Sequence, residues 1–352
     1  APRGVRDPET DQGPGEGPPQ RRLGRAMGDA RLELIGLLQS RLTGATVPEF
    51  CRRLAPDMAD YAEEAVGRFG PRLGADLVAA FERTAAARGN PRFPWFGITQ
   101  MMMVVTPLPE LRPASPAWRH GEDLRFLDAL RRFVERTRFD EWVGERKPLF
   151  DRWTAKLRPL VDKEPYAEAV SAYVGRPVAA YYDVVLTPLL RGARIRAILL
   201  GEDGARGART VLGPLTNKAE FDECLVSPDE DALLWTGWHE HLHTLLDPWC
   251  GLYEPEAARF EPLYATLNTE ARRKDWMDCF SEHHVRAVTQ RLLLARRGRA
   301  AYERLAATDL KEGYRFTPAV TAALARYEAD RARWPTLLDF MPAWLKAWEG
   351  LA

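Results

Sequence analysis

His239-Glu240-His241-Leu242-His243 is the stretch that decides how this chain is interpreted. In a helix, residues four apart lie one turn from each other on the same face. The imidazoles of His239 and His243 can therefore reach one metal ion. Glu240 is placed to take a proton from a water molecule on that ion. The chain has six histidines, and three of them fall in this pentad, so composition alone does not explain the cluster.

The residues around the pentad predict a helix that begins after Ser227 and ends at Asp247-Pro248. Ser227 is a suitable N-cap, Pro228 takes the first helical position, and Glu230 follows three residues after the cap. The alternative is an ordinary core helix whose polar residues only find partners in the packing. Apolar residues supply a broad buried surface: Leu233, Leu234, Trp235, Trp238, Leu242, Leu245 and Leu246.

A catalytic zinc takes three protein ligands and keeps one position for water. One large family of zinc peptidases takes its third ligand from a His six residues after the second, following a Gly. The equivalent positions here are Trp249 and Leu246, so that pattern is absent. A second predicted helix, 275–297, supplies Glu282, which lies off its apolar row and which we take as the third ligand. That row recurs at helical spacing: Phe280, His284, Val288 and Leu292.

Other residues compete with Glu282 for this role: His283, His284, Glu270 and Asp278. Asp278 is one turn before Glu282, so a small change in helix register would exchange them. For His283 and His284, the favoured interpretation is a pair on one helix, with one ring at the surface and one in the packing. His241 lies two residues from each motif histidine and faces another side of the helix, so we expect it to pack or to support the ligands.

The two helices resemble the gluzincin group of zinc metallopeptidases, in which an HExxH helix is followed by a helix with a glutamate ligand. More closely, the chain resembles an uncharacterised bacterial family, a domain of unknown function, from about residue 50 to the end. The matching segments are His239 to Pro248, Glu282 to Ala287, Tyr327 to Leu337, and Phe340-Met341-Pro342. This resemblance implies a zincin-like fold and Zn²⁺ as the cofactor, without implying a substrate.

One position departs from the gluzincin pattern. Gluzincins often have an aspartate four residues after the glutamate ligand, which accepts a hydrogen bond from a zinc histidine. Arg286 stands there in this chain and cannot accept one. That hydrogen bond must then go to Asp247 or to a backbone carbonyl, while Arg286 either steadies Glu282 or binds a substrate carboxylate. The Gly-x-Met-Glu-Asn loop of aminopeptidases is also absent, which disfavours that type of exopeptidase.

The sequence therefore predicts a zinc-dependent hydrolase. We expect a metallopeptidase in which Glu240 activates a zinc-bound water for attack on a peptide carbonyl. Two alternatives stay open: Cys279 closes a structural zinc site, or the chain is a non-catalytic binding or regulatory protein on a zincin scaffold. The candidates for stabilising the oxyanion are Tyr253, which we prefer, Tyr264, His283, Arg286 and Tyr314.

The expected fold is α+β and mainly helical, with a small antiparallel sheet directly before the HExxH helix. Strands are predicted over 181–188, 193–200 and 208–212, and the last is assigned to the sheet edge that pairs with substrate. Residues 1–25 are expected to be disordered, 26–175 to form a helical N-terminal region, and 176–352 to form the zincin-like catalytic region. Further helices are predicted over 32–42, 48–68, 73–88, 124–136, 148–157, 165–174, 317–334 and 338–348.

Charge and composition narrow the partners. The 50 basic and 50 acidic residues cancel, and no basic tract is interleaved with aromatics, so no nucleic-acid partner is expected. No apolar run is long enough for a transmembrane segment. A peptide or protein substrate is expected, and the oligomeric state is open. The four cysteines, Cys51, Cys224, Cys250 and Cys279, either pair in an exported protein or stay reduced in the cytoplasm; export is favoured because this enzyme class often works outside cells.

Overall fold

The computed structural model describes residues 26–44, 52, 55–88, 94–113, 121–163, 166–178, 181–190, 194–200, 206–212, 230–268, 271–272 and 275–351. The segment expected to be disordered, 1–25, and the expected cap Ser227 lie outside the described residues. Within the described part of the chain, no helix combines the length and the apolar character needed to cross a bilayer.

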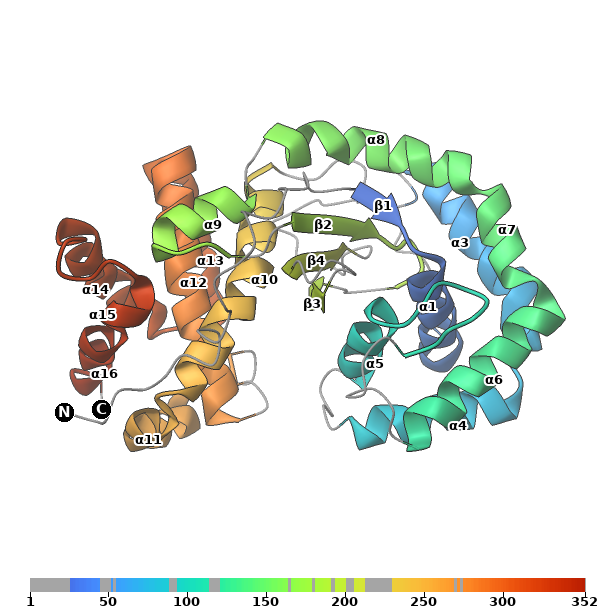
Figure 1. Ribbon diagram of the computed structural model, residues 1–352, viewed down its shortest axis with the longest axis horizontal. Helices are drawn as coiled ribbons and strands as arrows, with labels where there is room; N and C mark the ends of the chain where they lie inside the picture. The colour runs from blue at the N-terminus through green and yellow to red at the C-terminus, as the bar shows by residue number, and fades with distance from the viewer. Residues whose placement is uncertain are drawn as a thin grey trace, which may run out of the picture.

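A first group of helices curves around one side of a small central sheet (Figure 1). Its centre is α1 (Ala30–Thr43), in which every residue from Arg31 to Ser40 is buried. Asp29 caps this helix, and Gly44 ends it in the left-handed conformation at φ 64°. The other members are α3 (Pro56–Phe69), η1 (Gly70–Arg72), α4 (Ala75–Ala87), α5 (Pro94–Met103), α6 (Gly121–Thr137), α7 (Phe139–Glu145) and α8 (Lys147–Lys163).

The central sheet is mixed, so the expectation of an antiparallel sheet is wrong. Its described strands are β1 (Ala26–Gly28), β2 (Tyr181–Leu186), β3 (Arg194–Leu200) and β4 (Arg206–Leu212), in the order β1-β2-β4-β3. Only β3 and β4 pair antiparallel, whereas β1–β2 and β2–β4 are parallel.

The difference lies in the order of the strands. β3 follows β2 in the chain but is not its neighbour in the sheet, because β4 lies between them, parallel to β2 and antiparallel to β3. Consequently β4, which was expected at the edge, pairs on both sides, and β3 is an outer strand of the described sheet. The strands themselves lie where the sequence predicts them, and β1 comes from the N-terminal region.

A second group of helices covers the opposite side of the sheet (Figure 1). α10 (Glu230–Gly251) contacts β3 and β4, and it packs against α12 (Trp276–Arg297). These two helices form the most extensive helix pair of the molecule. Around them lie α9 (Tyr166–Val174), α11 (Glu254–Ala257), η3 (Ala258–Thr266), α13 (Arg299–Lys311), α14 (Thr317–Ala329), α15 (Leu337–Trp344) and α16 (Lys346–Glu349).

The end of α10 differs from its prediction. The helix was expected to stop at Asp247-Pro248, but it continues to Gly251. Pro248 has no N–H to donate to the carbonyl four residues earlier, which normally weakens a helix. Here Trp249 and Cys250 are buried, and the backbone N–H of Leu252 donates to the Pro248 carbonyl at 3.2 Å. Packing of the last turn offsets the missing bond.

A glycine lets α9 approach α10 just before the histidine pentad. A Cβ atom on Gly237 would lie 2.2 Å from Cε1 of Tyr166, closer than any real contact. The absence of a side chain therefore allows the Tyr166 ring to lie directly on the helix backbone. This contact packs α10 from the side of α9.

Candidate metal centre

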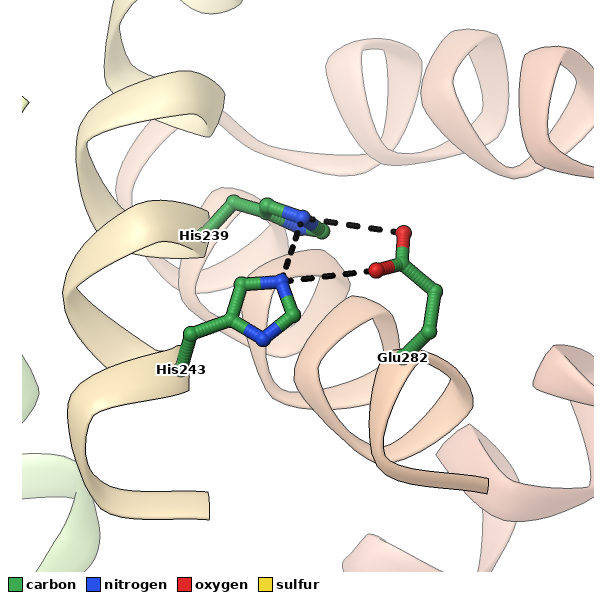
Figure 2. A group of neighbouring side chains, drawn as sticks. All are labelled: His239, His243 and Glu282. Atoms are coloured by element: carbon green, nitrogen blue, oxygen red, sulfur yellow. Dashed lines mark hydrogen bonds and ion pairs between the residues drawn. The ribbon is translucent and has the colours of Figure 1, made fainter. Parts of the chain in front are cut away.

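Three side chains from two helices converge between α10 and α12 (Figure 2). His239 and His243 come from α10, and Glu282 comes from α12. The two Nε2 atoms are 3.1 Å apart. Nε2 of His239 is 3.6 Å from Oε1 of Glu282, and Nε2 of His243 is 3.4 Å from Oε2. All three residues are buried, and together they could hold a metal ion.

No other group of three or more His, Cys, Asp or Glu side chains with this geometry occurs within the described residues. The structure therefore brings together the three residues that the sequence predicts as ligands. Helical spacing explains His239 and His243, since residues four apart share a face. The packing of α12 on α10 brings Glu282 to them.

Asp247 orients His243 and links the two helices. Its Oδ1 lies 2.9 Å from Nδ1 of His243, and it also accepts a hydrogen bond from the Ser281 hydroxyl. An ionised carboxylate only accepts hydrogen bonds, so the proton of the neutral imidazole is assigned to Nδ1. This leaves the lone pair of Nε2 directed at His239 and Glu282. Asp247 was one of the two partners expected from the sequence.

Trp235 supports the other histidine of the group, His239. Its ring stacks on that of His239 with centroids 4.5 Å apart and an interplanar angle of 26°. The two residues are one turn apart on α10, so the helix itself aligns the rings. Stacking fixes the plane of the His239 imidazole and turns Nε2 toward Glu282.

Arg286 supports the carboxylate. Its Nε donates to Oε1 of Glu282 at 2.7 Å, and its other nitrogens pair with Asp309 and Glu312. Its guanidinium lies 3.5 Å from the centroid of the Tyr314 ring. Burial acts to lower the pKa of Arg286, but these acidic neighbours outweigh it and raise the pKa well above its ordinary value. A permanent positive charge at this distance favours the ionised form of Glu282.

Glu240 follows His239 directly and is 6% exposed. It belongs to the same turn of α10 as the two histidines, at the position that an HExxH motif gives to a proton acceptor. His241, two residues from each ligand, is fully buried and stands outside the group of ligand atoms. Burial lowers the pKa of His241 to about 4, so it is a neutral packing residue.

His283 and His284 are both buried in the core, although one of the two was expected at the surface. Nδ1 of each lies close to the backbone carbonyl four residues earlier, that of Cys279 at 2.7 Å and that of Phe280 at 2.8 Å. Nε1 of Trp348 donates to Nε2 of His284 at 3.4 Å. Burial lowers the pKa of His284 to about 3, and the ring is therefore neutral.

Two of the remaining candidates, Asp278 and Cys279, do not join the group either. Asp278 is exposed in the first turn of α12, and Glu270 lies outside the described residues. The Cys279 thiol donates to the carbonyl of Ala271 at 3.4 Å, and Cys279 does not join the group of possible ligands. Cys279 and Cys250 are both free thiols. Cys51 and Cys224 lie outside the described residues.

Two candidates for an oxyanion donor, Arg286 and Tyr314, contact each other next to Glu282. Arg286 donates to Glu282 and also pairs with Asp309 and Glu312, and its guanidinium lies on the Tyr314 ring. Burial raises the pKa of Tyr253, and the charges of Glu256 and Asp339 raise it further, so this phenol faces acidic groups.

Three supporting residues escaped the sequence reasoning: Trp235, Ser281 and Asp309. Trp235 was assigned to the apolar surface, although its position one turn before His239 is a usable signal. Ser281 and Asp309 have no such signal, because their partners are distant in sequence.

Fold and site together define a mainly helical α+β protein with a buried His, His, Glu group shared by two packed helices. The chain belongs to the family described as "Domain of unknown function (DUF4932)", which matches residues 121–347. The match begins at α6, so the family region is shorter than the expected span from about residue 50. No curated protein and no solved structure matches the chain.

Proposed function

We propose that the protein is a zinc-dependent hydrolase, a gluzincin-type metallopeptidase with a zincin-like active site. The observation that carries this proposal is the convergence of His239, His243 and Glu282, with Glu240 beside the first ligand. This combination supplies both a metal site and an adjacent proton acceptor.

The spacing of the ligand atoms supports zinc as the metal. Ligand atoms at the corners of a tetrahedron, 2.0–2.1 Å from zinc, lie roughly 3.3–3.4 Å from one another. The three separations in this group are 3.1, 3.6 and 3.4 Å. Two imidazole nitrogens and one carboxylate also favour zinc over magnesium or calcium, which prefer oxygen ligands.

His239, His243 and Glu282 would hold the zinc ion, which would supply a Lewis acid and lower the pKa of a bound water to near 7. The work of this chain's residues follows from their placement. The Glu240 carboxylate takes the proton of the attacking water and returns it to the nitrogen of the leaving amine. Asp247 holds the proton on Nδ1 of His243 throughout, so that Nε2 stays available as a ligand.

The sheet supports a peptide as the substrate. β3 lies at the edge of the described sheet and contacts α10, the helix that carries the histidines. An extended peptide could add to this edge through backbone hydrogen bonds. It would then lie next to β3, the strand that contacts the helix carrying the histidines. The edge strand in this proposal is β3, in place of β4.

The position of Cys279 argues against a closed structural zinc site. Its thiol is engaged by the Ala271 carbonyl, and it does not join His239, His243 and Glu282. A zinc bound by this group therefore keeps a position for water, which a structural site lacks.

Metal content tests the proposal. Elemental analysis of the wild type purified without chelators should find about one zinc per chain, and His243→Ala and Glu282→Ala should lose it. Cys279→Ala is the matched control and should keep it. A screen of quenched fluorescent peptides should then detect hydrolysis by the wild type and none by Glu240→Gln. A metal-free wild type, or zinc lost with Cys279, would contradict the proposal.

A further inference from the structure

Arg286 is an unusual neighbour for a metal ligand, because it is a buried cation on the carboxylate that should attract the metal. It is 4% exposed and sits one turn after Glu282 on α12. Its Nε donates to Oε1 of Glu282 at 2.7 Å, which leaves Oε2 facing His243 at 3.4 Å. The two carboxylate oxygens therefore have different environments: Oε1 lies between Arg286 and His239, and Oε2 faces His243.

The guanidinium is itself held by residues from a neighbouring helix. Asp309, on α13, pairs with Nη1 of Arg286 and accepts a hydrogen bond from the Gln290 amide at 2.6 Å. Oε1 of Gln290 accepts in turn from the Thr321 hydroxyl of α14 at 3.0 Å. A continuous set of buried hydrogen bonds thus runs from Glu282 through α12 to α13 and α14.

Stability alone is a weak reason for such a set. Desolvation of buried charges costs about as much as their pairing returns, so apolar residues of similar size stabilise a core equally well. The contact with Glu282 has another consequence. Ordering a glutamate side chain costs rotamer entropy, and Arg286 orders Glu282 before a metal arrives.

We propose that Arg286, anchored by Asp309, is a positioning residue of the metal centre that sets the orientation of Glu282. The inference rests on the proposed metal binding by His239, His243 and Glu282. Asp247 orients one ligand through a carboxylate on the imidazole, and Arg286 orients another through a guanidinium on the carboxylate. The helix that anchors Arg286, α13, lies outside both metal helices.

The positive charge of Arg286 draws electron density from the Glu282 carboxylate, which makes Glu282 a weaker ligand. Arg286 also holds the carboxylate in one orientation before a metal binds, which makes Glu282 a better ligand. Without the Arg286 guanidinium, Glu282 and Asp309 would lose their shared hydrogen-bond donor, and Glu282 would no longer be held in its orientation toward the histidines. Loss of positioning therefore outweighs the gain in ligand basicity. Loss of a group that orients a ligand typically weakens metal binding by about 10–100-fold, and we expect this range here.

The test uses conservative variants that keep size in the core. Arg286→Lys retains the charge, but one ammonium cannot reproduce the fork that joins Glu282 to Asp309. Asp309→Asn retains the shape and removes the anchoring charge. Arg291→Lys is the matched control, because Arg291 lies on the same helix and also pairs with a glutamate, Glu328, at 2.7 Å. Zinc dissociation constants come from competition with a chelator, and thermal unfolding is recorded for each variant.

Arg286→Lys and Asp309→Asn should each raise the zinc Kd about 10–100-fold, and Arg291→Lys should leave it unchanged. The double variant Arg286→Lys/Asp309→Asn should have a zinc Kd no higher than that of the single variant that binds zinc less tightly, because both changes break the same linkage. The visible spectrum of the Co²⁺-loaded protein should change in both Arg286→Lys and Asp309→Asn, since a displaced Glu282 alters the ligand field.

A wild type that binds zinc, with variants whose Kd and Co²⁺ spectrum equal those of the wild type, would overturn the positioning role alone. Lowered thermal stability with an unchanged Kd would overturn it equally, because it would show a merely structural ion pair. A wild type that binds no zinc would overturn the proposed function instead. The two failures are therefore distinguishable.

Discussion

Glu33 and Glu282 are both buried, on opposite sides of the sheet, and their surroundings differ. Glu33 lies on α1 with no exposed surface and accepts a hydrogen bond from the Tyr61 hydroxyl at 3.0 Å. Glu282 lies on α12, where Arg286 donates to one oxygen and two histidines face the carboxylate.

The groups that act on Glu33 include no cation. Burial raises the pKa of Glu33 to about 8, although hydrogen bonds from Thr187 and Tyr61 oppose the rise. Glu33 is therefore a protonated, neutral core residue near pH 7. Burial alone therefore does not prepare a carboxylate for metal binding. Glu282 differs from Glu33 in the fixed cation beside it and in the two imidazoles that face it.

The largest expected effect is a difference in zinc content between variants of Glu282 and Glu33. Glu282→Gln removes the anionic ligand, so we expect the dialysed protein to lose most of its zinc. Glu33→Gln mimics the protonated side chain and should keep the wild-type zinc content. Elemental analysis of both variants measures the difference. Equal zinc contents in the two variants would contradict the claim that Glu282 binds zinc and Glu33 does not.

A third buried glutamate, Glu240, should affect turnover without affecting binding. Glu240→Gln removes the proton acceptor, so kcat on a peptide substrate should fall by about 10²–10⁴-fold. Zinc content should stay at the wild-type level, because Glu240 is not part of the ligand group. Steady-state kinetics and elemental analysis on one preparation check both statements. Undiminished turnover would remove Glu240 from the mechanism.

Glu33 should make stability depend on pH. Its pKa in the folded chain, about 8, exceeds the ordinary value of 4.5. The folded state therefore binds a proton that the unfolded chain has released, and the free energy of unfolding falls as pH rises from about 4.5 to about 8. The slope from one such group is at most about 1.4 kcal/mol per pH unit.

Glu33→Gln has no proton to release and should lose this slope. Urea denaturation of both proteins without metal, at several pH values between 5 and 8.5, measures it. The stability of the variant relative to the wild type should increase with pH. Parallel stability curves for the two proteins would show that Glu33 does not titrate in this window.

The smallest effect on the metal centre is expected from His284. His284→Phe keeps a ring in the core but leaves the N–H of Trp348 and the carbonyl of Phe280 without their side-chain partner. Lost buried hydrogen bonds of this kind cost about 1–3 kcal/mol. Thermal unfolding should register this loss, while zinc content should not change. Loss of zinc in this variant would make His284 part of the site.

The sequence predicted that His239, His243 and Glu282 would lie together, and the structure brings them together, because the information is local. His239, Glu240 and His243 follow from helical spacing, and Glu282 follows from the apolar row of a long second helix. Asp247 was expected as a partner of the histidines because it lies one turn after His243. Most helices and all three strands expected before α10 also lie close to their predicted ranges.

The sequence was less informative where tertiary contacts decide. The order of the strands depends on a β1 segment some 150 residues from β2, which no local pattern reveals. α13 was not predicted, and with it the Asp309 contact to Arg286 was missed. The continuation of α10 past Pro248 depends on burial of Trp249 and Cys250, which outweighs the local stop signal.

X-ray absorption spectroscopy of the zinc-loaded wild type tests the central claim most directly. The account predicts nitrogen and oxygen ligands only, about 2.0–2.2 Å from zinc, with the multiple-scattering signature of two imidazoles from His239 and His243. A sulfur at about 2.3 Å would contradict it, because Cys279 would then close the site. A spectrum without imidazole would place zinc elsewhere and contradict the account equally.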